Sequence, residues 1–278
     1  MTGPLGIAVA VSHLFADADV CERMRRFADA YELRDHHGPR EFVTDRPVLF
    51  HVEASILTPV DVDAIARRVE VYANQGRLRI VSLHALSCYT EPRLEGRAFQ
   101  PGGRRMAASE MIDCAASNRE QLVARLGGDV IIAAENNNAL PTPAYDTVTD
   151  ARFLGRMVAE SRVELLLDLG HAAISARYHG VSLDAYVAAL PSERVVQIHV
   201  AGIGRVDGQW TDDHVEPIDE DWAALGRWLP RLPTLQFVTI EYYRDVDRLL
   251  RLHERLVSFV DAINTGRGRD ARPEGVSA

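Results

Sequence analysis

Short apolar runs alternate along this chain with longer segments of helical periodicity, and this alternation constrains the fold most strongly. The runs are rich in Val, Ile and Leu, which is typical of strands buried on both faces of a parallel sheet. Strands are predicted at residues 6–11, 48–51, 79–84, 130–135, 163–168, 195–199 and 237–241. Helices are predicted at residues 17–31, 59–75, 107–126, 149–160, 182–190, 220–228 and 245–264.

The number of strand–helix units predicts a single (β/α)8 TIM barrel over residues 1–264. A weak eighth strand is placed at residues 40–44. The alternative is a doubly wound sheet, but a dinucleotide-binding version would carry a glycine-rich turn after its first strand, and here Gly3 and Gly6 precede that strand. Residues 265–278 are rich in Gly, Arg and Pro, and we expect them to form a disordered tail.

Six of the predicted strands end in a histidine or a carboxylate, and these ends would meet at the C-terminal mouth of a barrel. The six residues are His51, His84, Glu135, Asp168, His199 and Glu241. Three more candidates follow in the loops: His171, Asp212 and His214. A polar residue at one strand end is commonplace and needs no function. Six of seven predicted strands is not, because only 10 of the 278 residues are histidines.

The chemistry that suits this set is metal binding. Imidazole and carboxylate ligands together fit Zn, Fe and Mn, and no cysteine ends a strand. The candidates exceed the needs of one ion, so Glu135 and Glu241 are placed as bridges between two or three ions. An extended segment would place Asp212 and His214 on one side and turn Asp213 away, to support the ligands. Cys88 lies nearer the mouth than the other two cysteines, as a weaker candidate.

The composition excludes several other kinds of chemistry. All 31 basic residues are arginines, so lysine Schiff bases, pyridoxal-phosphate enzymes and P-loop kinases are excluded. A net charge of -9 argues against a nucleic-acid partner. No apolar stretch is long enough to span a membrane, and the N-terminal segment lacks the basic region of a signal peptide. Three cysteines without Cys-x-x-Cys spacing fit a reducing cytoplasm.

Several local sequences resemble those of a known group of enzymes. They are ENNNAL at 135–140, LLLD at 165–168, SARYHG at 175–180, VVQIHVAG at 195–202, WTDDH at 210–214 and IEYY at 240–243. Together they resemble the multinuclear non-heme iron-dependent oxidative enzymes, which include the methanobactin-type peptide oxidases, within the xylose-isomerase-like TIM-barrel superfamily. The resemblance covers residues 130–255; before them it depends mainly on His51 and His84.

This resemblance implies an oxidase or oxygenase with two or three iron ions in mixed Fe(II)/Fe(III) states. It implies metal ligation by His51, His84, Glu135, Asp168, His171, His199, Asp212, His214 and Glu241. It also implies that O2 and a peptide residue or small natural-product intermediate are the substrates, with a partner protein that delivers a peptide. Asp212, His214 and Asn136 are the expected catalytic residues. Many members carry Asn where His171 stands, which leaves the metal number open and Zn or Mn as alternatives.

Other readings of the same residues stay open. A barrel of this type fits an endonuclease-IV-like phosphodiesterase, a sugar isomerase or epimerase, or a non-catalytic metal-binding protein. The long segment 87–106 is a candidate lid, and its arginines would bind an acidic substrate or simply be solvated; they are Arg93, Arg97, Arg104 and Arg105. His179 is read as structural or substrate-facing. The three tryptophans are expected to pack rather than to stack on substrate.

Overall fold

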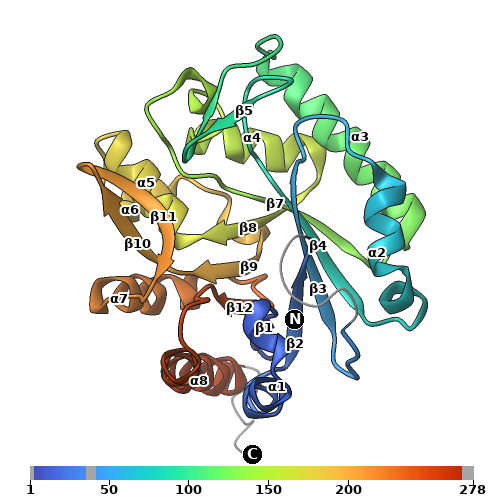
Figure 1. Ribbon diagram of the computed structural model, residues 1–278, viewed down its shortest axis with the longest axis vertical. Helices are drawn as coiled ribbons and strands as arrows, with labels where there is room; N and C mark the ends of the chain where they lie inside the picture. The colour runs from blue at the N-terminus through green and yellow to red at the C-terminus, as the bar shows by residue number, and fades with distance from the viewer. Residues whose placement is uncertain (1–2, 36–41, 271–278) are drawn as a thin grey trace, which may run out of the picture.

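The computed structural model describes residues 3–35 and 42–270, and it confirms the predicted (β/α)8 barrel. Eight parallel strands close in the order β1-β12-β9-β8-β7-β4-β3-β2, with the helices outside them (Figure 1). The barrel strands are β1 (Gly6–Ala10), β2 (Ala30–Arg34), β3 (Val48–Ser55), β4 (Leu78–His84), β7 (Ile131–Glu135), β8 (Glu164–Asp168), β9 (Val195–Val200) and β12 (Phe237–Ile240).

Helices pack their apolar faces against the outside of this sheet, and several begin at an aspartate. The side chains of Asp17, Asp61 and Asp150 each accept a hydrogen bond from a backbone N–H of the first turn. The helices are α1 (Ala18–Arg25), α2 (Val62–Asn74), α3 (Ala108–Leu126), α4 (Ala151–Ser161), α5 (Leu169–Tyr178), α6 (Leu183–Ala188), α7 (Asp219–Trp228) and α8 (Val246–Asp270). Short 3-10 turns occur at His13–Ala16, Pro143–Tyr145, Ser192–Arg194 and Leu229–Arg231.

The eighth strand was predicted in the wrong place. Residues 40 and 41 lie outside the described residues, and residues 42–44 form no strand. The missing strand is β2, whose residues pair with β1 and β3, and the helix predicted to reach Tyr31 ends at Arg25. The reason is that β2 reads AYELR, and its two charged side chains break the continuous apolar run used to recognise the other strands.

Two further boundaries differ from the prediction. Helix α5 follows β8 without a loop and was not predicted, because its residues from Leu169 to Ala176 are all buried and show no amphipathic period. Helix α8 continues to Asp270, past the expected end of the barrel at residue 264. The predicted disordered tail is therefore helical at its start, and residues 271–278 lie outside the described residues.

Two hairpins rise from the C-terminal side of the barrel. Strands β5 (Arg93–Glu95) and β6 (Ala98–Gln100) follow β4, and strands β10 (Gly202–Val206) and β11 (Gln209–Val215) follow β9. Because each hairpin leaves the C-terminal end of a barrel strand, both stand at the mouth (Figure 1). The predicted lid segment 87–106 thus contains a folded hairpin.

The barrel interior is built in layers along the strands. Its apolar layer takes one side chain from each of seven strands: Ala8, Ala30, Leu49, Ile80, Ala133, Leu166 and Val196. Alternate side chains share a face, so the residues two positions further along five of these strands form the next layer. That layer is polar and buried, and contains Glu32, His51, Ser82, Glu135 and Asp168. The apolar layer therefore closes the barrel directly beneath the candidate site.

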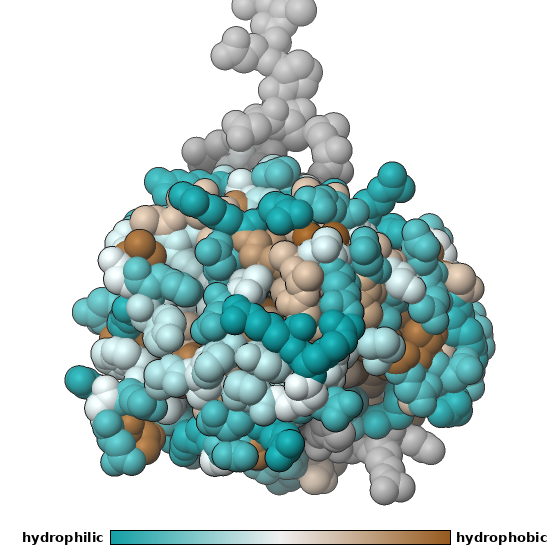
Figure 2. Space-filling model, turned by 90° about the horizontal axis from the view of Figure 1, so that it is seen from above, coloured by the Kyte–Doolittle hydropathy of each residue, from teal (hydrophilic) through white to brown (hydrophobic). Residues whose placement is uncertain are grey.

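The outer surface is polar. On the face drawn in Figure 2, hydrophilic residues predominate and hydrophobic ones form small separate patches. Among the described helices, none combines the length and apolarity needed to cross a bilayer.

Candidate metal centre

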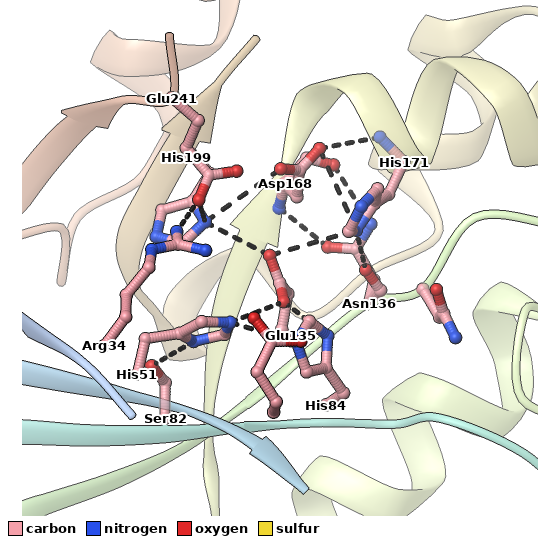
Figure 3. Close-up of polar contacts among 12 residues, drawn as sticks. Arg34, His51, Ser82, His84, Glu135, Asn136, Asp168, His171, His199 and Glu241 are labelled. Carbon is pink, nitrogen blue, oxygen red and sulfur yellow. Dashed lines mark hydrogen bonds and ion pairs between the residues drawn. The ribbon is translucent and has the colours of Figure 1, made fainter. Parts of the chain in front are cut away.

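Glu135, at the end of β7, is the centre of a buried cluster at the barrel mouth (Figure 3). Its Oε2 lies 2.7 Å from Nδ1 of His84 and 3.4 Å from Nε2 of His51. Its Oε1 lies 3.1 Å from Nδ1 of His199. One carboxylate thus faces three imidazoles from three other strands, which is the arrangement expected of a bridging group.

Three carboxylates gather around His199 on the other side of the cluster. Nδ1 of His199 lies 3.3 Å from Oε1 of Glu241 and 4.0 Å from Oδ2 of Asp168. One side-chain atom from each of Glu135, Asp168, His199 and Glu241 lies within 4.8 Å of the others, and all four residues are buried. Such a group has the spacing needed to hold an ion.

Asp168 and His171 are fixed by the start of α5. Asp168 is the N-cap of this helix, and its Oδ1 accepts a hydrogen bond of 2.6 Å from the backbone N–H of His171. Asp168 ends β8 as predicted, whereas His171 was expected on a loop and lies instead on the first turn of α5. Nδ1 of His171 donates to the carbonyl oxygen of Asn136 at 2.8 Å. The second ring nitrogen of His171 is thereby turned toward the mouth.

Asn136 holds Asp168 in place through the backbone. Its Nδ2 donates to the carbonyl oxygen of Asp168 at 3.0 Å, and its Oδ1 accepts from the backbone N–H of Asp168 at 2.9 Å. Both polar atoms of this side chain are therefore used within the protein. Asn136 was expected to orient a ligand or substrate and to be catalytic; these contacts orient Asp168, and the catalytic role stays a prediction.

The β10–β11 hairpin adds Asp212 and His214. Oδ2 of Asp212 lies 3.1 Å from Nε2 of His171 and 3.4 Å from Nε2 of His214, which in turn lies 3.1 Å from Oε2 of Glu241. His214 has a positive φ of 44°, so the strand is not regularly extended there. The two side chains nevertheless share one side, as predicted.

Asp213 points away from the cluster and anchors the hairpin. Its carboxylate pairs with Arg97 at the turn of the β5–β6 hairpin and accepts from Thr211 Oγ1 at 2.7 Å. Its carbonyl oxygen accepts from Arg244 at 2.8 Å. The two hairpins at the mouth are thereby tied together beside Asp212 and His214.

The sequence analysis did not single out several polar residues that contact this cluster. Oε2 of Glu53 lies 3.7 Å from Nε2 of His84, and the hydroxyl of Tyr243 donates to Oε1 of Glu241 at 3.2 Å. Glu32 and Arg34 of β2 contact His199 and Glu241. A signal for the last two was present, since they are opposite charges spaced to share one strand face, but the predicted helix took the first two residues of β2 and no element was predicted over Glu32 and Arg34.

Burial and close charges shift the titration of the cluster strongly. Burial would lower the pKa of His199, but the carboxylates of Glu32 and Glu135 raise it to about 9. Burial likewise opposes the charge on His171, yet Asp168 and Asp212 hold its pKa well above the usual value. Burial raises the pKa of Asp168 to about 6. In the metal-free protein, protonated imidazoles therefore balance much of the carboxylate charge.

The donor atoms fit a metal better than they fit one another. Two buried oxygens of the predicted ligands make no hydrogen bond within the described residues, Asp168 Oδ2 and Asp212 Oδ1, while His84 Nδ1 and Glu135 Oε2 face only each other at 2.7 Å. Buried polar atoms normally have partners, so orphans gathered in one cluster indicate a missing cation. The set offers only nitrogen and oxygen, which suits Fe, Mn or Zn. Cys88 takes no part, because its thiol donates to the carbonyl oxygens of Pro143 and Ala144.

The remaining candidates lie outside this cluster. Arg104 and Arg105 of the lid segment pair with Glu110 and Asp146, as Arg97 does with Asp213. His179 lies 3.2 Å from Thr149 Oγ1 and stacks on Tyr186, so its contacts are structural. Trp222 and Trp228 are buried in the core, and Trp210 lies between the guanidinium groups of Arg177 and Arg205.

A family model and several curated proteins match the sequence. The model described as RiPP precursor modification enzyme MbnB/TglH/ChrH matches residues 32–263; RiPPs are ribosomally made, post-translationally modified peptides. A UPF0276 protein of Caulobacter vibrioides is 38% identical over 101 residues, 34% of this chain and 36% of that protein. A UPF0276 protein of Rhizorhabdus wittichii is 32% identical over 130 residues, 46% of each chain. The chain thus spans between about a third and a half of these relatives' lengths in the matches.

Solved structures share the barrel. An L-ribulose 3-epimerase has a TM-score of 0.61 at 10% identity, covering 98% of this chain and 100% of that one. A D-psicose 3-epimerase from Clostridium cellulolyticum H10 has a TM-score of 0.59 at 10% identity, covering 94% of this chain and 99% of that one. A putative xylose isomerase from Rhodospirillum rubrum has a TM-score of 0.56 at 14% identity, covering 97% of this chain and 100% of that one. At these identities the likeness establishes the fold alone.

Proposed function

The chain belongs to the MbnB/TglH/ChrH family of RiPP precursor modification enzymes, and we propose that it uses O2 to oxidise a residue of a ribosomally made peptide at two or three non-heme iron ions. The observation that carries the proposal is the convergence of imidazoles and carboxylates on Glu135, with orphaned donor atoms facing one another. A small natural-product intermediate is the alternative substrate. We expect Fe(II) and Fe(III) together, with Zn or Mn as alternatives.

Nine residues would hold the metal ions, and Glu135 and Glu241 each contact several of the others. They are His51, His84, Glu135, Asp168, His171, His199, Asp212, His214 and Glu241. Bound iron would supply the one-electron chemistry with O2 that none of these side chains provides. The protein's part is to fix the donors: Ser82 Oγ lies 2.8 Å from Nδ1 of His51, and Asn136 fixes Asp168 and His171.

The substrate is proposed to approach over Asp212 and His214. Their side chains are 19% and 28% exposed, whereas those of Glu135, Asp168 and His199 are at most 1% exposed. Burial lowers the pKa of His214, which favours its neutral form. We therefore propose Asp212 and His214 as the catalytic residues that contact substrate. Delivery of the peptide by a partner protein is part of the same proposal.

Anaerobic purification with metal analysis tests the metal centre first. We expect two to three irons per chain, with Mössbauer or EPR signals of mixed Fe(II)/Fe(III), and O2 consumption when a precursor peptide is added. His199→Ala is expected to lose iron, and His179→Ala, a histidine substitution outside the cluster, is expected to retain it. Stoichiometric zinc with cleavage of a phosphodiester would instead favour hydrolysis. Bound metal without O2 consumption or turnover would favour a non-catalytic barrel.

A further inference from the structure

A fully buried group of polar side chains surrounds Nε2 of His199, opposite the carboxylates that face its Nδ1. Oε2 of Glu32 lies 2.8 Å from Nε2 of His199 and accepts from Thr239 Oγ1 at 3.1 Å. The side-chain amide of Gln197 also donates to this oxygen. Glu32, Gln197, His199 and Thr239 are all 0% exposed. One carboxylate oxygen is therefore surrounded by three side chains from β9 and β12.

Arg34 keeps this carboxylate ionised and in place. Its Nη2 lies 2.9 Å from Oε1 of Glu32, and the same guanidinium pairs with Glu241 (Figure 3). The guanidinium also lies over the ring of Tyr243, 5.7 Å from its centroid. Because arginine is always charged in proteins, Glu32 faces a permanent cation that favours its ionised form. An ionised carboxylate can only accept hydrogen bonds.

The tautomer of His199 follows from that constraint. Gln197 Nε2 lies 3.2 Å from His199 Nε2, and a hydrogen bond between them would need an unprotonated Nε2. An unprotonated Nε2 would place its lone pair 2.8 Å from a carboxylate oxygen, so the protonated form is the favoured one. Nε2–H then donates to Glu32. The other nitrogen, Nδ1, faces Glu135, Glu241 and Asp168 and is the one left to bind a metal.

We propose that Glu32 is a positioning residue that fixes His199 with Nε2 protonated and Nδ1 presented to the metal between Glu135, Asp168 and Glu241. This inference rests on the metal centre of the proposed function but not on iron or O2. A carboxylate behind a ligating histidine orients the ring and raises its basicity, and its loss typically costs 10–100-fold in metal affinity. Arg34 links Glu32 to the proposed ligand Glu241, because its guanidinium contacts the carboxylates of both residues.

Cobalt binding to the purified, metal-free chain tests the proposal without any turnover. Glu32→Met removes the acceptor at similar volume, and Glu32→Gln keeps an uncharged acceptor. Thr239→Val is the matched control, because it removes another hydrogen bond to the same oxygen of Glu32 without touching His199. We expect Co(II) affinity to fall about 10–100-fold in Glu32→Met, less in Glu32→Gln, and to stay within about twofold of wild type in Thr239→Val. Equal losses in Glu32→Met and Thr239→Val would overturn the proposal.

Nitrogen-15 NMR of the imidazoles decides the question even if a Glu32 variant does not fold. In zinc-loaded wild type, assigned with His199→Ala, we expect a proton on Nε2 of His199 and zinc on Nδ1. Zinc on Nε2 would refute the inference.

The inference and the proposed function can fail separately. If the protein oxidises a peptide but its Glu32 variants bind metal as tightly as wild type, the inference is wrong and the proposed function stands. If His199 has the expected tautomer but the protein does not react with O2, the proposed function is wrong and the inference stands.

Discussion

The two oxygens of Asp168 have different environments, and this separates a structural role from a metal-binding role. Oδ1 caps helix α5 through its hydrogen bond of 2.6 Å from His171 N. Oδ2 is buried without a hydrogen-bond partner among the described residues, 4.0 Å from Nδ1 of His199. Asp168→Asn keeps an oxygen for the cap but replaces one ligand oxygen and the charge. Asp168→Ala removes both functions.

The size of each effect can be estimated. Loss of an N-cap costs about 1 kcal/mol, so in the presence of a chelator Asp168→Ala should be less stable than Asp168→Asn by about that amount. Burial penalises the charged form of Asp168, so Asp168→Asn should be at least as stable as wild type without metal. A metal at about 100 times its dissociation constant would stabilise wild type by about 2.7 kcal/mol. Both variants should lose most of this metal-dependent stabilisation, because each lacks the carboxylate oxygen proposed to bind the metal.

Urea unfolding of the three proteins, each with chelator and with cobalt, measures these differences. The difference between the two variants in chelator reports the cap, and the gain that cobalt gives to each protein reports the ligand. If Asp168→Asn gained as much from cobalt as wild type does, Oδ2 would not be a ligand. If Asp168→Ala were as stable as Asp168→Asn in chelator, the cap would contribute nothing.

Three further predictions concern other parts of the fold. Burial lowers the pKa of His253 to about 4, so this group stays neutral in the folded protein while the unfolded chain takes up a proton near pH 6.5. The free energy of unfolding that neutral His253 contributes should therefore fall by about 3 kcal/mol as the pH drops from 6.5 to 4. Urea unfolding of His253→Leu should lack this loss. The same pH dependence in His253→Leu and wild type would contradict the assignment. Arg97→Ala removes an exposed ion pair with Asp213, so the free energy of unfolding should change by less than about 1 kcal/mol, while amide hydrogen exchange in the β5–β6 hairpin should become faster. Unchanged exchange would mean that Asp213 does not hold the hairpin. Gly202→Ala would bring a Cβ against the carbonyl of Glu216, so the β10–β11 hairpin must shift and metal content should fall; full metal content would show that Asp212 and His214 tolerate the shift.

Most of the fold followed from the burial pattern of the strands. Parallel strands inside a ring of helices are buried on both faces, so seven of them were visible as apolar runs. The candidate ligands were visible for a related reason, because a closed parallel barrel brings all its C-terminal strand ends to one mouth. The first turn of α5 was not visible, since a helix buried on every side, from Leu169 to Ala176, has no polar face to reveal its period.

The polar residues around Nε2 of His199 show where sequence reasoning stopped and why. Ala30, Glu32 and Arg34 share the inner face of β2, and an opposite pair of charges two residues apart is what a buried strand tolerates when the charges pair with each other. The remaining partners of Glu32 are Gln197, His199 and Thr239, which lie 165 to 207 positions away. No local pattern can reveal them, because only closure of the barrel brings β2 within reach of β9 and β12 across its interior. An opposite-charge pair inside an otherwise apolar five-residue run is therefore the sequence signal that such a polar group leaves, and in this chain it marks the one barrel strand that apolarity alone did not find.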